Sequence, residues 1–187
     1  MKTAFSFEDL LHQRYPHLPS NRCNGVNCSM SNEETRFLER AIELSRQGMV
    51  NGLGGPFGCV IVRDGIIIGE GCNEVTTTLD PTAHAEVVAI RNACKAIADF
   101  QLTDCDIYAS CEPCPMCLGA IYWARPRRVI YANTKGDAAA INFDDQFIYD
   151  EIQKADSQRQ IQFVHRPHPV AREVFEQWKK MANKTIY

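Results

Sequence analysis

Two short motifs supply three metal-binding side chains, and any fold of this chain has to bring them together. The first motif is His84-Ala85-Glu86, and the second is Pro113-Cys114-Pro115-Met116-Cys117. One imidazole and two thiolates can hold Zn²⁺ tetrahedrally and leave the fourth position for water. Glu86 lies two residues beyond the histidine, close enough to reach that water without binding the metal. The expected ligands are therefore His84, Cys114 and Cys117.

This ligand set favours hydrolysis. Zinc lowers the pKa of a bound water from 15.7 to about 7, and Glu86 is then the candidate to take the water's proton and deliver it to the substrate. A closed structural site is the alternative, with Cys111 as fourth ligand. Structural zinc sites normally fill all four positions. The glutamate beside the histidine and the separation between the two motifs favour the open, catalytic site.

The hydrophobic periodicity predicts an α/β fold. Ser31-Asn32-Glu33-Glu34 is typical of a capping box that begins a helix. Residues 59–62 and 66–68 flank an Asp-Gly turn and predict a β-hairpin. The remaining pattern predicts helices over 84–100, 116–123 and 170–183, and strands over 106–109, 128–131 and 161–164. We therefore expect a mixed sheet of about five strands covered by helices, with both zinc motifs near helix N-termini.

Length and charge limit the organisation and the partners. A chain of 187 residues fits one domain with tails. We expect an irregular extension over 1–30, the zinc domain over 31–165, and a C-terminal helix and tail over 166–187. No apolar run approaches the ~20 residues of a membrane helix. The net charge of −3 argues against a nucleic-acid partner despite the basic stretch Arg125-Pro126-Arg127-Arg128.

The cysteines indicate a reducing compartment. There are nine, an odd number, and no secretory signal precedes them. A cytoplasmic protein is therefore expected. Cys23 and Cys28 lie in the polar N-terminal stretch, where they are exposed thiols, a pair or metal ligands.

From about residue 31 to 187 the chain resembles bacterial guanine deaminases of the cytidine deaminase superfamily. The H-x-E…P-C-x-x-C pattern marks the zinc nucleobase deaminases as a whole. The stretches that carry the closer resemblance are Gly54-Gly55-Pro56-Phe57-Gly58, residues 80–86, residues 110–126, Phe143-Asp144-Asp145, and Ala182-Asn183-Lys184 with the terminal Tyr187. The resemblance implies a three-layer α/β/α cytidine deaminase-like fold, a zinc cofactor, and hydrolysis of guanine to xanthine and ammonia.

The resemblance also implies substrate contacts at Phe57, Asn73, Ala85, Asp145 and Tyr187. In that family the ring that matches Phe57 packs on the base. The side chains that match Asn73 and Asp145 form hydrogen bonds with the base, and the terminal tyrosine, here Tyr187, closes the site. Taken alone, Phe57 is equally a core side chain, Asn73 a turn residue, Asp145 a helix cap and Tyr187 a frayed terminus. In several members the C-terminal segment crosses to the neighbouring subunit, which implies a homodimer with swapped tails.

Three rival functions remain open at this point. The same zinc chemistry deaminates other small rings, such as guanosine, cytosine or an aminotriazine like ammeline, because the pocket selects the ring. Editing of adenosine in transfer RNA needs a basic groove that the acidic balance does not favour. A zinc-binding interaction module without catalysis is the third. Ammonia release from guanine separates them.

Overall fold

A computed structural model describes residues 30–143 and 145–186 of the chain. The chain divides into two compact units, Met1–Phe143 and Asp144–Tyr187. This division falls earlier in the chain than the boundary expected at residue 165. Cys23 and Cys28, together with nearly all of the expected N-terminal extension, lie outside the described residues.

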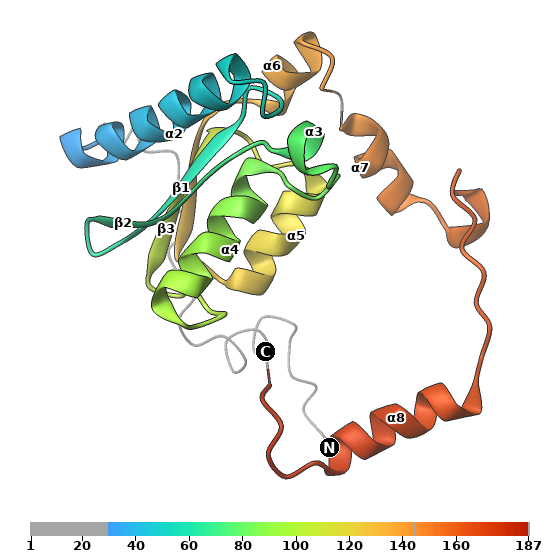
Figure 1. Cartoon of the computed structure of the whole chain (residues 1–187). Coiled ribbons are helices and arrows are strands. Elements are labelled where there is room, and N and C mark those ends of the chain that lie inside the picture. The colour runs from blue at the N-terminus through green and yellow to red at the C-terminus, as the bar shows by residue number, and fades with distance from the viewer. Residues whose placement is uncertain (1–29, 144, 187) are drawn as a thin grey trace, which may run out of the picture. The chain divides into compact units, whose positions relative to one another are not determined.

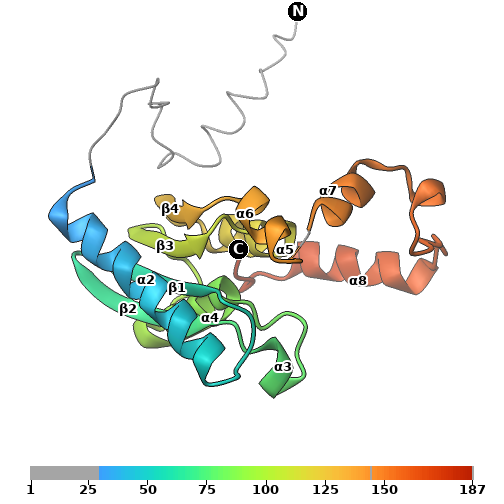
Figure 2. The same cartoon turned by 90° about the horizontal axis from the view of Figure 1, so that it is seen from above.

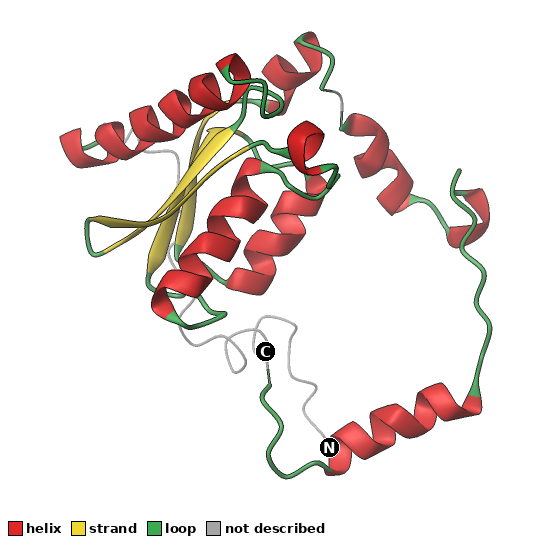
Figure 3. Cartoon of the chain, in the orientation of Figure 1, coloured by secondary structure: helices red, strands yellow, loops and turns green. Residues whose placement is uncertain are grey.

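The first unit is built on a mixed sheet of four strands in the order β2-β1-β3-β4. β1 pairs antiparallel with both β2 and β3, and β3 pairs parallel with β4. Figure 3 shows this sheet with helices on both sides. The strands cover Gly58–Arg63 (β1), Ile66–Cys72 (β2), Cys105–Cys111 (β3) and Arg128–Asn133 (β4).

The prediction of a fifth strand was wrong. Residues 161–164 belong to the second unit and have no strand assignment. The segment Ile161-Gln162-Phe163-Val164 is rich in β-branched and aromatic residues, as a strand is, yet its three apolar side chains are exposed. An isolated extended segment is not a strand without a ladder partner, and the described residues of the second unit contain no other strand. The rest of the predicted order is confirmed.

The hairpin between β1 and β2 follows directly from its turn residues. Asp64 and Gly65 have φ angles of 51° and 75°. Positive φ at both central residues is the backbone of a two-residue turn whose twist matches the flanking strands, and Asp-Gly is a favoured sequence for it. The turn sets the pairing of Arg63 with Ile66 and of Val62 with Ile67, and a bulge between Ile61 and Val62 then shifts the register by one residue. Gly58 consequently pairs with Cys72, which places Phe57 before β1 beside Asn73 after β2.

Helices cover both faces of the sheet, as the three-layer prediction required (Figures 1 and 2). Alternate residues of β1 face opposite layers. Val60 and Val62 pack in a cluster with Phe37 of helix α2, whereas Cys59 and Ile61 pack in a second cluster with helices α4 and α5. These helices cover Asn32–Val50 (α2), Ala85–Ile97 (α4) and Pro115–Ala124 (α5).

The N-terminus of α2 carries the capping box that the sequence predicted. The Ser31 side chain accepts from the backbone of Glu34, and the Glu34 carboxylate accepts from the Ser31 backbone. Glu34 also pairs with Arg128 of β4 at 2.7 Å. The cap therefore joins the helix to the sheet as well as satisfying its own first turn.

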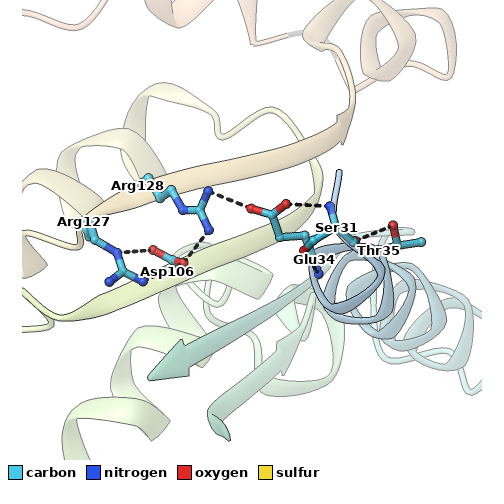
Figure 4. A network of polar contacts seen from close by, with 6 residues as sticks. All are labelled: Ser31, Glu34, Thr35, Asp106, Arg127 and Arg128. Carbon is cyan, nitrogen blue, oxygen red and sulfur yellow. Dashed lines mark hydrogen bonds and ion pairs between the residues drawn. The ribbon is translucent and has the colours of Figure 1, made fainter. Parts of the chain in front are cut away.

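A buried carboxylate continues this network across the sheet (Figure 4). Asp106 of β3 accepts from Arg127 Nε and Nη2 at 2.9 Å each, and from Arg128 Nη2 at 3.0 Å. Burial raises the pKa of Asp106, but the hydrogen bonds from Arg127 and Arg128 outweigh it and hold that pKa below its ordinary value. Two arginines of the basic stretch thus hold β3, β4 and α2 together.

The shorter helices were not predicted. They are α3 (Val75–Thr78) and α6 (Lys135–Ala140) in the first unit, and α7 (Gln146–Gln153) with the 3₁₀ turn η1 (Asp156–Gln158) in the second. The predicted C-terminal helix is present as α8 (Pro169–Lys180). Its apolar stripe is exposed in this chain and comprises Val170, Val174, Phe175 and Trp178. Within the described residues, every helix is too short or too polar to cross a membrane.

Candidate metal centre and active site

Several element ends meet at one end of the sheet and bring the predicted residues of the first unit together. Backbone hydrogen bonds join the neighbouring segments. The Asn73 N–H donates to the Phe57 carbonyl at 3.0 Å, and the Glu74 N–H donates to the Ala83 carbonyl at 3.0 Å. The segment before β1 and the segment after β2 therefore lie beside the residues that lead into α4.

Both zinc motifs lie at helix N-termini, which confirms the sequence-based expectation. His84 is the N-cap residue of α4, with Glu86 in its first turn. Cys114 is the N-cap residue of α5, its Sγ accepting from the Cys117 N–H at 3.5 Å, and Pro115 occupies the first helical position. The free N–H groups and the dipole at a helix N-terminus favour a thiolate over a thiol.

The three predicted ligands form one cluster. His84 Nδ1 lies 3.5 Å from the Sγ atoms of both Cys114 and Cys117, and the three ligand atoms all lie within 4.8 Å of one another. Tetrahedral zinc with ordinary Zn–N and Zn–S bonds places nitrogen and sulfur ligands about 3.6 Å apart. The donor set and its spacing therefore fit Zn²⁺ bound by three side chains.

Cys111 is not part of this cluster. Its Sγ lies 3.5 Å from the Thr134 carbonyl oxygen, to which the thiol donates. Burial is the main cause that raises the pKa of Cys111 to about 11. The group of ligand atoms within 4.8 Å of one another consists of His84, Cys114 and Cys117 and does not include the Cys111 thiol, which is turned to the Thr134 carbonyl. The closed structural site is therefore not supported.

The two cysteine ligands share charge before any metal binds. A hydrogen bond from the Cys117 thiol, helped by one from His84, lowers the pKa of Cys114 to about 4 although burial opposes it. The pKa of Cys117 is raised because its proton is held by the Cys114 thiolate and because the thiol is buried. Zinc binding requires both to be thiolates, so it displaces the remaining proton.

Glu86 lies beside the cluster without belonging to it. Its carboxylate is buried, and Oε2 lies 3.4 Å from Cys117 Sγ. Burial is the largest influence on the pKa of Glu86 and raises it. A buried carboxyl group beside the metal ligands, with its pKa raised, is of the type that serves as a general acid–base group.

Three of the predicted substrate residues lie at this end of the sheet. The half-buried Phe57 ring precedes β1, and Ala85 is buried at the first position of α4. Asn73 is also buried, and its Oδ1 accepts from the N–H groups of Gly55 and Val75 at 3.2 and 3.3 Å. The Asn73 amide is therefore oriented with its oxygen already engaged and its Nδ2 as the remaining donor.

The other two predicted substrate residues belong to the second unit. Asp145 occupies the N-cap position of α7, the position that the alternative interpretation assigned to it. Tyr187 lies outside the described residues. The substrate roles of both stay predictions.

Sequence reasoning assigned no role to two residues that shape this end of the sheet. Phe143 packs against Phe57 with ring centroids 4.9 Å apart and planes at 87°. Ser110 is buried, and its Oγ accepts from the Gly58 N–H at 2.9 Å. Both lie within stretches that carry the family resemblance, which was the available signal.

The family model of the cytidine and deoxycytidylate deaminase zinc-binding region matches residues 31–133. The guanine deaminase of Bacillus subtilis is 56% identical over 156 residues, which cover 83% of this chain and 99% of that protein. The aligned length exceeds the region of the family model, so the similarity extends beyond the zinc motifs.

Two further relatives place the fold and the nearest rival. An X-ray structure of the Bacillus subtilis guanine deaminase matches with a TM-score of 0.81 and 55% identity, covering 84% of this chain and 99% of that one. A tRNA-specific adenosine deaminase of Agrobacterium fabrum is 40% identical over 109 residues, covering 57% of this chain and 70% of that protein.

Proposed function

The chain belongs to the family of the cytidine and deoxycytidylate deaminase zinc-binding region, and from that membership we propose that it hydrolyses guanine to xanthine and ammonia. The ligand cluster and the adjacent carboxylate supply the chemistry of the family. One observation carries the choice of substrate: 56% identity to a guanine deaminase across 83% of the chain.

His84, Cys114 and Cys117 are the residues that hold the metal. When bound there, zinc supplies a Lewis acid that makes a water molecule acidic near neutral pH. Glu86 would accept the first proton of that water and pass it to a ring nitrogen of guanine, while the water oxygen bonds to the ring carbon that carries the amine. The same carboxylate would then take the second proton from that oxygen and deliver it to the amine. The C–N bond breaks, the oxygen remains as the carbonyl of xanthine, and ammonia leaves.

Binding of the base falls to residues around the cluster. Phe57 offers a half-buried aromatic face on which a purine packs. Asn73 holds its oxygen on two backbone N–H groups, so Nδ2 donates to an acceptor on the purine. Ala85 is small and buried beside the ligand His84, which leaves room for the base. Asp145 and Tyr187 complete the proposal as a carboxylate acceptor and a closing aromatic group.

A substrate panel tests the proposed activity. Ammonia release is measured with guanine, guanosine, cytosine, adenine and ammeline, and with a transfer RNA anticodon stem-loop that contains adenosine. Guanine is expected to have the highest kcat/KM. A higher kcat/KM for any other compound would assign the chain to that substrate, and ammonia from none of them would favour the zinc-binding interaction module.

Editing of transfer RNA is the weaker candidate. It has support from the 40% identity to an adenosine deaminase, but that similarity covers only 57% of this chain. Arg127 and Arg128, which the basic stretch offered for RNA, are engaged by Asp106 and Glu34. The guanine assignment accounts for a larger share of the chain.

We also propose a cytoplasmic homodimer in which the C-terminal segment closes a partner's site. The exposed apolar stripe of α8 supports this, because Val170, Val174, Phe175 and Trp178 form a face that needs a cover. The cysteines within the described residues form no disulfide, in keeping with a reducing compartment.

Complementation between two inactive chains tests the swap. Deletion of residues 184–187 is expected to raise KM and lower kcat without removing zinc, since these residues close the site. A mixture of this truncated chain with a Glu86→Gln chain should recover activity, because one site then combines an intact Glu86 with an intact tail from the partner. No recovery after confirmed subunit exchange would mean that each tail serves its own chain.

A further inference from the structure

Phe143 has no assigned role, although its ring stands against the proposed base-stacking residue. Building on the proposed function, we propose that Phe143 is a positioning residue. Its ring sets the orientation of the Phe57 ring, on which the purine packs. The two phenyl rings have room to meet because residue 55 is glycine. The juxtaposition of Phe143, Phe57 and Gly55 carries this inference.

The contact between the two rings is an edge-to-face pair. Their centroids are 4.9 Å apart and their planes cross at 87°. This arrangement sets the positive edge of one ring against the negative face of the other, so it favours one mutual orientation. Phe143 is 44% exposed and is therefore not a core side chain. Its ring contact with Phe57 is the specific interaction that an aromatic residue provides at this position.

Both rings stand on fixed backbone. The Phe57 N–H donates to the Gly55 carbonyl at 2.8 Å, and the Phe57 carbonyl accepts from Asn73 at 3.0 Å. The Phe143 N–H donates to the Ala138 carbonyl of α6 at 3.0 Å. With the backbones held, the rings turn only about their side-chain bonds, and each limits the other.

Gly55 leaves the space in which the rings meet. A Cβ atom at this position would lie 2.8 and 3.0 Å from Phe143 Cζ and Cε1, and 3.1 Å from Phe57 Cε2. Contacts this short force the rings to move. Among the described glycines, Gly52 and Gly65 have positive φ and Gly55 does not. An added methyl group at residue 55 is therefore a steric probe of the ring pair without backbone strain.

The test compares Gly55→Ala, Phe143→Leu and the double variant with the wild-type enzyme in its zinc-loaded form. Gly136→Ala is the matched control, because a Cβ there meets nothing closer than Thr134 Oγ1 at 3.5 Å. We expect each single variant to raise the KM for guanine roughly two- to tenfold, the range for loss of one aromatic pair. Zinc content and kcat should change much less.

The double variant separates positioning from a structural role. The shorter leucine makes room for the methyl group added at residue 55, so the KM of the double variant should approach that of Phe143→Leu alone rather than the product of the two effects. Independent effects, or a fall in melting temperature with unchanged KM, would overturn the positioning role while leaving the deaminase activity intact. Absence of guanine turnover in the wild-type chain would overturn both.

Discussion

Replacement of Asp106 by Asn is predicted to destabilise the first unit measurably. The Asp106 carboxylate accepts three hydrogen bonds from two guanidinium groups, and its side chain is only 6% exposed. The amide has a similar shape but only one oxygen and no negative charge. It turns its NH₂ group towards a cation and leaves donors without an acceptor.

The magnitude follows from burial on each side of the network. A hydrogen bond to a charged group contributes about 1.5–3 kcal/mol, but the two arginine side chains are 56% and 49% exposed. Water replaces part of what they lose. The expected loss is therefore about 2 kcal/mol in the free energy of unfolding, far below the sum of three bonds. For a chain of this size that is a fall of roughly 4–8 °C in melting temperature.

Thermal unfolding at matched zinc occupancy is the assay, because a bound metal contributes its own stabilisation. Asp104→Asn serves as the control. The Asp104 carboxylate lies 3.7 Å from the Arg63 guanidinium, and the Asp104 side chain is 71% exposed. That variant should unfold within about 0.5 kcal/mol of wild type. If Asp106→Asn also unfolds within about 0.5 kcal/mol of wild type, this network does not hold β3, β4 and α2 together.

The network also fixes the sign of a pH effect. Hydrogen bonds from Arg127 and Arg128 hold the folded-state pKa of Asp106 below its ordinary value of 3.8. Its contribution is therefore complete above the unfolded-state pKa and is lost as pH falls through the folded-state pKa. The stability difference between wild type and Asp106→Asn should persist at neutral pH and shrink in acid below 3.8.

The remaining predictions concern the metal ligands. Cys114→Ala is expected to lose zinc and stability, because ligand loss also removes folding free energy; elemental analysis that still finds one zinc per chain would exclude Cys114 as a ligand. Cys111→Ala is expected to keep one zinc per chain, since its thiol donates to the Thr134 carbonyl, and metal loss would revive the four-ligand site. Lowering the pH should release zinc as His84 and the thiolates take up protons, and zinc retained after complete protonation of His84 would contradict its role.

The zinc cluster was predictable from sequence because ligand chemistry restricts residue type. Few residues bind zinc, and the catalytic arrangement needs an open position and a nearby acid–base group. The helices after both motifs were also predictable from sequence. Pro115 marked the start of the helix at the cysteine motif, and apolar periodicity indicated the helix after His84. Local rules therefore located His84, Glu86, Cys114 and Cys117. The fold brings the three ligand atoms within 4.8 Å of one another and places Glu86 Oε2 3.4 Å from Cys117 Sγ.

The features that the sequence did not predict correctly, or did not predict at all, depend on tertiary contacts. Residues 161–164 have the composition of a strand, yet a strand exists only where a neighbour accepts its hydrogen bonds. The Phe57–Phe143 pair joins positions far apart in the chain, and nothing local couples them. The orientation of the Asn73 amide likewise depends on the backbone of Gly55 from another loop. Such contacts become visible only once the chain is folded.

The central claim is that Glu86 moves protons beside a metal that it does not bind. The most direct measurement is zinc content and guanine turnover of Glu86→Gln, side by side with wild type. We expect one zinc per chain in both proteins and a kcat about 10²–10⁴-fold lower in the variant. A zinc-loaded Glu86→Gln protein with the wild-type kcat would contradict the proton-shuttle role, and loss of zinc would show that Glu86 takes part in holding the metal.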